Sequence, residues 1–83
     1  MVNDTFGVTK DAKRSINRAF GDRVRELRAA RDWSQERMGE ACDLHWTYIG
    51  GIERGERNPT LESVYKVAKG LKIKVSELFE GLG

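Results

Sequence analysis

Residues 43–59 read DLHWTYIGGIERGERNP, and this stretch decides the fold. Its hydrophobic period predicts a short amphipathic helix from about His45 to Arg54, with Gly55 as a C-cap just beyond it. On a helical wheel the apolar face carries Leu44, Tyr48, Ile49 and Ile52. The opposite face carries Trp46, Thr47, Gly50 and Arg54, with Gly51 at its edge. Each glycine inside a helix costs roughly 1 kcal/mol relative to alanine, so the adjacent pair needs an explanation other than helix stability.

Two helical patterns precede this stretch. Ser34 is a suitable N-cap, and SQERMGEAC predicts a short helix that buries Met38 and Cys42. A longer pattern begins at Thr9 and ends near Asp32. Its apolar face carries Ile16, Phe20, Val24 and Leu27.

Two further patterns follow the break at NPT. Thr60 is expected to cap a fourth helix, whose buried face carries Leu61, Val64, Val67, Ala68 and Leu71. KIKV reads as a short connection, and Ser76 is expected to cap a final turn that carries Leu78 and Phe79. The chain shows no convincing strand, repeat or low-complexity tract. The predicted fold class is therefore all-α, with five short helices.

Composition narrows the classes of function. The chain has 83 residues, one cysteine and a net charge of +2, which predicts a single domain without an internal disulfide. Its apolar runs are shorter than the roughly 18 residues that a membrane span needs. A lone Cys42-x-x-His45 has too few partners for a zinc site, and no nucleophile–base set or phosphate-cradling loop is evident. We expect no enzyme activity, metal, cofactor or small-molecule ligand.

The two short central helices suggest a specific arrangement. Each has about nine residues and the link between them has about two, so they are expected to cross at a steep angle. Such a crossing needs a small residue where the axes meet, and Gly39 stands in the middle of the first helix. This is the helix-turn-helix, whose second helix is presented to the major groove of DNA.

The run WSQERMGEACDLHWTYIGGIERGERNPTLESVYKVAKGLKIKVSELF resembles the XRE, or Cro/phage-repressor-like, helix-turn-helix family. The resemblance covers about residues 18–80 and implies a five-helix lambda-repressor-like domain. LH.TYIGGIERGERN is also similar to small controller regulators of restriction–modification systems. The sequence departs from the family pattern at Gly39, where alanine is usual, at Asp43, where glycine makes a left-handed turn, and at His45, where serine or threonine caps the helix. We expect a modestly strained turn and a weakly capped third helix.

The resemblance implies which residues read bases and which contact phosphates. The base readers are expected at His45, Trp46, Thr47 and Gly51. Phosphate contacts are expected from Gln35, Tyr48, Arg54, Arg57 and Asn58, and the less favoured alternative for the last three is an ordinary charged loop. The glycine pair permits close approach to DNA in one interpretation and tight packing of Gly51 against the first or second helix in the other.

Other residues are expected to be structural. Arg28 and Glu53 match an ion pair that is buried in family members and is expected to orient the third helix. Trp33 and Cys42 are expected in the core. A symmetric homodimer is expected through Leu71, Ile73, Val75, Leu78 and Phe79, which are more apolar than a monomer of this size needs to expose.

The predicted division is a flexible N-terminus (1–8), an extension of the first helix (9–17), the helix-turn-helix domain (18–80) and a C-terminal end (81–83). The extension could lengthen the first helix, contact a partner subunit or lay its basic side chains on DNA. The predicted function is a sequence-specific transcriptional regulator that binds inverted operator half-sites in the cytoplasm, at the nucleoid of a prokaryote or on phage DNA. The alternatives are an antitoxin or adaptor that uses the same domain, and a pure protein-interaction module.

Overall fold

The computed structural model describes the backbone of residues 10–82 and the side chains of residues 16–82. Its helices are α1 (Lys10–Ala29), α2 (Gln35–Cys42), α3 (Trp46–Glu53), α4 (Leu61–Leu71) and α5 (Val75–Leu78). The predicted all-α class and five helices are confirmed for this part of the chain. The predicted flexible segment 1–8 and the side chains of residues 9–15 lie outside the described residues.

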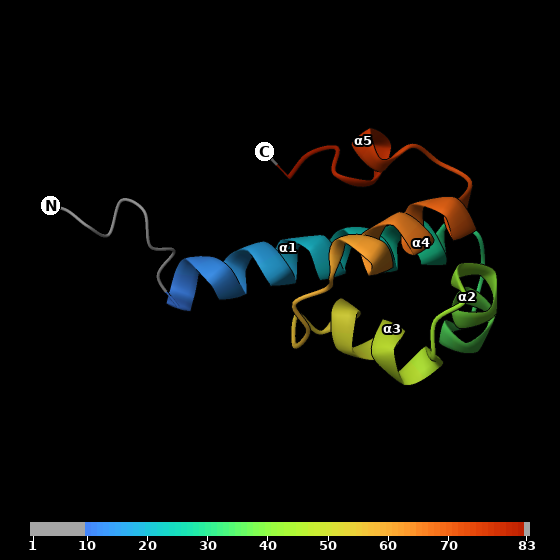
Figure 1. Cartoon of the computed structure of the whole chain (residues 1–83), viewed down its shortest axis with the longest axis horizontal. Helices are drawn as coiled ribbons and strands as arrows, with labels where there is room; N and C mark the ends of the chain where they lie inside the picture. Colours follow the sequence, from blue (N-terminus) through green and yellow to red (C-terminus); the bar gives the residue numbers. More distant parts are fainter. Residues whose placement is uncertain (1–9, 83) are drawn as a thin grey trace, which may run out of the picture.

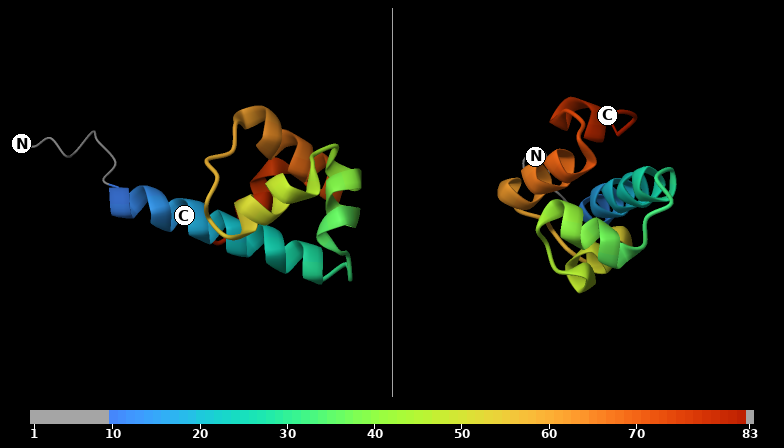
Figure 2. Two further views of the ribbon diagram at one scale, coloured as in Figure 1. Left: turned by 90° about the horizontal axis from the view of Figure 1, so that it is seen from below. Right: turned by 90° about the vertical axis from the view of Figure 1, so that its right-hand side faces the viewer.

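Helix α1 forms the long axis of the molecule, and its N-terminal turns extend beyond the other helices (Figure 1; Figure 2). It packs against α3, while α2 packs against both α3 and α4. Helix α5 lies on the other side of the molecule from α3 in Figure 1, and the right view of Figure 2 agrees. The helix-turn-helix therefore forms one side of the domain and α5 the other.

The core lies where the apolar faces of these helices meet. Its fully buried side chains include Val24, Met38, Ile49, Ile52, Val67 and Leu78. Cys42 is buried as predicted, and its burial raises the pKa of the thiol to about 11. Trp33 packs only partly against the core, and the guanidinium carbons of Arg31 and Arg37 lie 5.9 Å and 5.2 Å from a ring centroid of its indole.

Two apolar side chains predicted to be buried are exposed. Ile16 lies in the N-terminal half of α1 and is 62% exposed. Leu61 is the first residue of α4 and is 87% exposed. In both cases the hydrophobic period continues beyond the part of the helix that is packed against neighbours.

Local residues set most helix ends. The Ser34 and Thr60 hydroxyls accept hydrogen bonds from the backbone N–H groups of Arg37 and Ser63 at 3.0 Å each, as N-caps do. α1 ends at Ala29 rather than near Asp32, and a hydrogen-bonded turn follows it. The predicted cap at Ser76 is wrong. α5 begins after Lys74, whose N–H donates to the Glu77 carboxylate at 2.9 Å.

The turn between α2 and α3 has the predicted left-handed residue. Asp43 has φ 57° and ψ 46°, a conformation that Asp tolerates better than most residues. The helices cross at Gly39, where an added Cβ would lie 2.6 Å from the Leu44 carbonyl oxygen. The prediction that Gly39 is the small residue at this crossing is confirmed. A residue without a Cβ is also required at Gly21 in α1, which was not predicted from the sequence. A Cβ there would lie 2.9 Å from the Glu53 carbonyl oxygen.

Candidate nucleic-acid interface

The N-terminal turn of α3 is exposed. His45, Trp46 and Thr47 are all exposed, and Trp46 retains 45% of its accessible surface. The rings of His45 and Trp46 stack with centroids 5.9 Å apart and planes inclined by 27°. These predicted base readers therefore form one surface at the start of the helix.

His45 caps this helix, contrary to the expectation of a weakly capped start. Its Nδ1 accepts a hydrogen bond from the Thr47 backbone N–H at 3.1 Å. The same ring nitrogen lies 2.7 Å from the Thr47 hydroxyl oxygen. The imidazole nitrogen thus accepts the N-cap hydrogen bond that a serine or threonine oxygen usually accepts.

The glycine pair lies under arginine side chains. A Cβ at Gly51 would lie 2.8 Å from Cγ of Arg57, and a Cβ at Gly50 would lie 3.1 Å from Nη1 of Arg54 and 3.3 Å from Oε1 of Gln35. The Cβ side of Gly51 thus faces a side chain of the following loop and not the first or second helix. Both glycines are buried, although Gly50 was expected on the exposed face.

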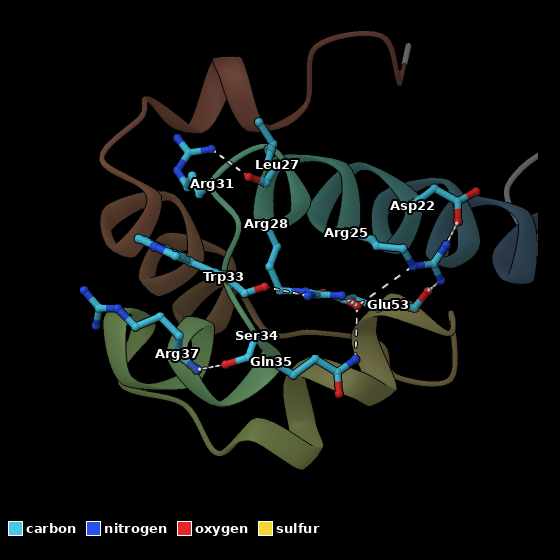
Figure 3. A network of polar contacts seen from close by, with 10 residues as sticks. All are labelled: Asp22, Arg25, Leu27, Arg28, Arg31, Trp33, Ser34, Gln35, Arg37 and Glu53. Atoms are coloured by element: carbon cyan, nitrogen blue, oxygen red, sulfur yellow. Dashed lines mark hydrogen bonds and ion pairs between the residues drawn. The ribbon is translucent and has the colours of Figure 1, made fainter.

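The C-terminal end of α3 is anchored by a buried carboxylate. Glu53 is 2% exposed, and its two oxygens accept from Nε and Nη2 of Arg28 at 2.6 Å and 3.0 Å (Figure 3). Arg28 also donates to the Trp33 carbonyl at 2.7 Å. The predicted ion pair is present, and the hydrogen bond to Glu53 raises the pKa of Arg28.

Two more side chains complete this network. Gln35 Nε2 donates to Glu53 Oε1 at 3.1 Å, which joins the start of α2 to the end of α3. Arg25 Nη2 donates to the Glu53 carbonyl oxygen at 3.0 Å. Arg25 was not predicted as part of this network, although its place three residues before Arg28 on the same helix was the available signal.

The predicted phosphate-binding side chains lie beside α3. Arg54, Arg57 and Asn58 are exposed, and Arg54 pairs with Glu56 at 3.0 Å. Arg57 lies over the half-buried ring of Tyr48, with its guanidinium carbon 5.4 Å from the ring centroid. Gln35 turns one amide hydrogen inward to Glu53, and its second hydrogen is left for another acceptor.

The apolar residues predicted for a dimer interface divide into two groups. Val75 and Phe79 are 40% and 41% exposed, and Ile73 is partly buried. Leu71 and Leu78 are 2% and 0% exposed. Their assignment to an exposed dimer surface is therefore wrong, because both belong to the core between α4 and α5. The burial predicted for Leu71 on the fourth helix is confirmed.

Arg23 and Phe20 of α1 hold α5 in place. Arg23 Nη2 donates to the Glu77 carbonyl at 2.7 Å and Nε to the Leu78 carbonyl at 3.4 Å. The Phe20 and Phe79 rings stack with centroids 5.3 Å apart. Within residues 10–82, no helix is long and apolar enough to cross a bilayer, and no three His, Cys, Asp or Glu side chains are placed to share a metal ion.

Helix α3 is short, is anchored at its C-terminal end and exposes its N-terminal turn, and α2 crosses it steeply. This arrangement defines a helix-turn-helix protein. Residues 24–78 match the helix-turn-helix family, and the chain belongs to it, in the XRE type that the sequence predicted. The match lies inside the predicted domain boundaries of 18–80.

Its relatives are restriction–modification controller proteins and helix-turn-helix transcriptional regulators. The control protein C.BamHI of Bacillus amyloliquefaciens is 40% identical over 67 residues, which cover 80% of this chain and 83% of that protein. The crystal structure of the restriction-modification controller protein C.AhdI from Aeromonas hydrophila is 44% identical, with a TM-score of 0.74, and the match covers 76% of this chain and 96% of that one. The HTH-type transcriptional regulator SutR of Escherichia coli is 34% identical over 62 residues, which cover 75% of this chain and 35% of SutR.

Proposed function

We propose that this protein is a sequence-specific, double-stranded DNA-binding transcriptional regulator that controls a restriction–modification system. The observation that carries the proposal is the contrast along α3. Its last turn is held by the buried Glu53 network, while His45, Trp46 and Thr47 at its first turn are exposed. A rigid helix displayed in this way fits the major groove, where base edges differ in their donors and acceptors. The names of C.BamHI and C.AhdI support the narrower role.

Phosphate contacts supply much of the affinity and set the register. Arg54 lies over Gly50 and Arg57 lies over Gly51. To bind the DNA backbone, the Arg54 guanidinium exchanges its contact with Glu56 and the Arg57 guanidinium exchanges its contact with the Tyr48 ring. The second amide hydrogen of Gln35 can add a third contact. The chain carries a net charge of only +2, so binding depends on this local cluster rather than on the whole surface.

A homodimer would double the contacts with DNA. Val75 on α5 and Phe79, the residue directly after this helix, are the exposed apolar residues of the predicted interface, with Ile73 at its edge. Because α5 and α3 lie on different sides of the domain, pairing through α5 leaves both recognition helices free. The two helices then read inverted half-sites about 34 Å apart, on operator DNA in the bacterial cytoplasm.

Footprinting of the DNA upstream of its own gene, at several salt concentrations, tests this function. The expected result is protection of two inverted half-sites, with affinity that falls steeply as salt rises. Arg57→Ala should weaken binding to all sequences alike, and Thr47→Ala should relax the preference within a half-site. Binding without sequence preference, or no binding at low salt, would contradict the proposal.

A protein-binding adaptor is the second candidate, and exposed apolar residues on α4 favour it. Leu61 and Tyr65 lie one turn apart on this helix and are 87% and 59% exposed. An adaptor of this kind should show no detectable DNA binding at any salt concentration. If the protein is instead a DNA-binding regulator, the double variant with Leu61→Ser and Tyr65→Ser should give the same DNA footprint as the wild type.

A further inference from the structure

The hydrogen bonds at the start of α3 fix which side chain can donate to a base and which can accept. The Thr47 backbone N–H points at Nδ1 of His45, at 3.1 Å. A backbone N–H can only donate, so Nδ1 must accept and carries no proton. In the neutral imidazole the proton is therefore on Nε2.

The same reasoning settles the Thr47 hydroxyl. Its oxygen lies 2.7 Å from Nδ1, which is hydrogen-bond distance. Because Nδ1 has no proton to give, the hydroxyl must donate to it. The Thr47 hydroxyl then has only its oxygen lone pairs to offer to another molecule.

The ring is held in this orientation. Its Nδ1 edge faces the first turn of α3, and the indole of Trp46 stacks against its face. Nε2 lies on the other side of the ring, and the side chain is exposed. His45 thus presents one N–H donor outward and no acceptor.

We propose that His45 and Thr47 form a donor–acceptor pair of fixed polarity that selects the base edges this protein reads. This inference rests on the proposed DNA-binding function. His45 selects a base with a major-groove acceptor, which guanine, adenine and thymine have. It rejects cytosine, whose major-groove edge offers only the N4 amino donor. Thr47 selects an exocyclic amino donor, which cytosine and adenine have.

The tautomer can be measured directly, because the chain has one histidine. Long-range ¹H–¹⁵N correlation spectra of the neutral imidazole should show a protonated Nε2 and an unprotonated, hydrogen-bonded Nδ1. The measurement needs no DNA. A proton on Nδ1 would overturn the proposal.

The base preference is tested with His45→Ser as the matched variant. Serine also caps a helix well, so α3 should keep its start while the outward imidazole Nε2–H is lost. Each base pair of a footprinted half-site is replaced in turn. Wild-type protein should bind about tenfold more weakly when cytosine occupies one position, and His45→Ser should lose this discrimination there and nowhere else.

Thr47→Val gives the complementary test, since valine matches threonine in shape and keeps the backbone N–H that holds Nδ1. It should lose preference at a neighbouring position while the cytosine rejection by His45 remains. Unchanged discrimination in His45→Ser, or a wild-type preference for cytosine at the position it affects, would overturn this inference alone. Absence of specific DNA binding by the wild type would overturn the proposed function as well, whatever the tautomer.

Discussion

The two ends of α3 differ in almost every physical respect. At the C-terminal end, Glu53 is buried and bonded to Arg28 and Gln35. At the N-terminal end, His45 and Trp46 are exposed and bonded or stacked only with their neighbours in sequence. The contacts that orient the helix thus lie about eight residues from the side chains that meet a ligand.

Because of this separation, a short helix can keep a fixed orientation while its exposed side chains vary. A helix of eight residues is marginal by itself, so its orientation must come from tertiary contacts. The polar contacts among them are concentrated at the C-terminal end, while Gly39 of α2 packs against the backbone at the other end. Side chains at the other end can then change, and with them the sequence that is recognised, without loosening the helix.

Breaking the anchored end should have the largest effect. Arg28→Met leaves the Glu53 carboxylate buried without its main partner, and unfolding in urea should show a loss of about 3 kcal/mol. The loss is at the lower end for a broken buried pair because Gln35 and Arg25 still contact Glu53. Arg54→Met, at the exposed pair with Glu56, is the control and should cost less than about 1 kcal/mol. Similar losses in the two variants would mean that the buried network does not anchor α3.

The free energy of unfolding should fall at alkaline pH because the Cys42 thiol is buried. Burial raises the pKa of Cys42 to about 11 from its ordinary value of 9.0. Above pH 9.0 the thiol ionises first in the unfolded chain, so the unfolded state loses protons and stability falls as pH rises towards 11. Each pKa unit corresponds to about 1.36 kcal/mol, which limits the loss to about 3 kcal/mol.

Chemical unfolding of the wild type and of Cys42→Ala at a series of pH values would measure the loss of stability caused by ionisation of the thiol. Other groups titrate in the same range, but they do so in both proteins. The difference between the two should therefore isolate the thiol. An equal pH dependence in Cys42→Ala would show that Cys42 is not buried as described.

Glycine substitutions compare the side of α3 that packs on α1 with the side that is covered by the Arg54 and Gln35 side chains. Gly21→Ala should destabilise by about 1–3 kcal/mol, because its Cβ would meet main-chain atoms of Ile52 and Glu53. Gly50→Ala should leave stability unchanged or raise it by up to about 1 kcal/mol. Its Cβ meets only the flexible ends of Arg54 and Gln35, and alanine favours the helix. Thermal unfolding measures both, and equal effects would contradict the described packing.

The smallest effect is expected at the exposed end. His45→Ala removes the cap of α3 and should cost about 1 kcal/mol, whereas His45→Ser should restore most of it. Thermal unfolding of the three proteins, in neutral buffer, makes the comparison. A His45→Ala protein as stable as the wild type would show that the Nδ1 hydrogen bond contributes nothing.

Much of the fold follows from local sequence. The N-caps at Ser34 and Thr60, the left-handed turn at Asp43 and the small residue at Gly39 each depend on the chemistry of one residue, so they could be predicted. The Arg28–Glu53 pair could be assigned only through family resemblance, because 25 residues separate the partners in the chain.

The remaining features depend on three-dimensional neighbours. A hydrophobic period does not show where packing stops, and for this reason Ile16 and Leu61 were misplaced. Burial of Leu71 and Leu78 depends on how α5 folds back over the core. The proton positions on His45 and Thr47 depend on a ring orientation that residue types alone leave open.

The attachment of α5 has a consequence for the evolution of related regulators within one cell. Arg23 bonds to the main-chain carbonyls of Glu77 and Leu78, and every amino acid supplies such carbonyls. Exposed side chains on α5 can therefore be replaced while the helix stays docked. If subunits pair there, duplicated copies can acquire separate partners through a few surface changes, and mixed assemblies are avoided without redesign of the fold.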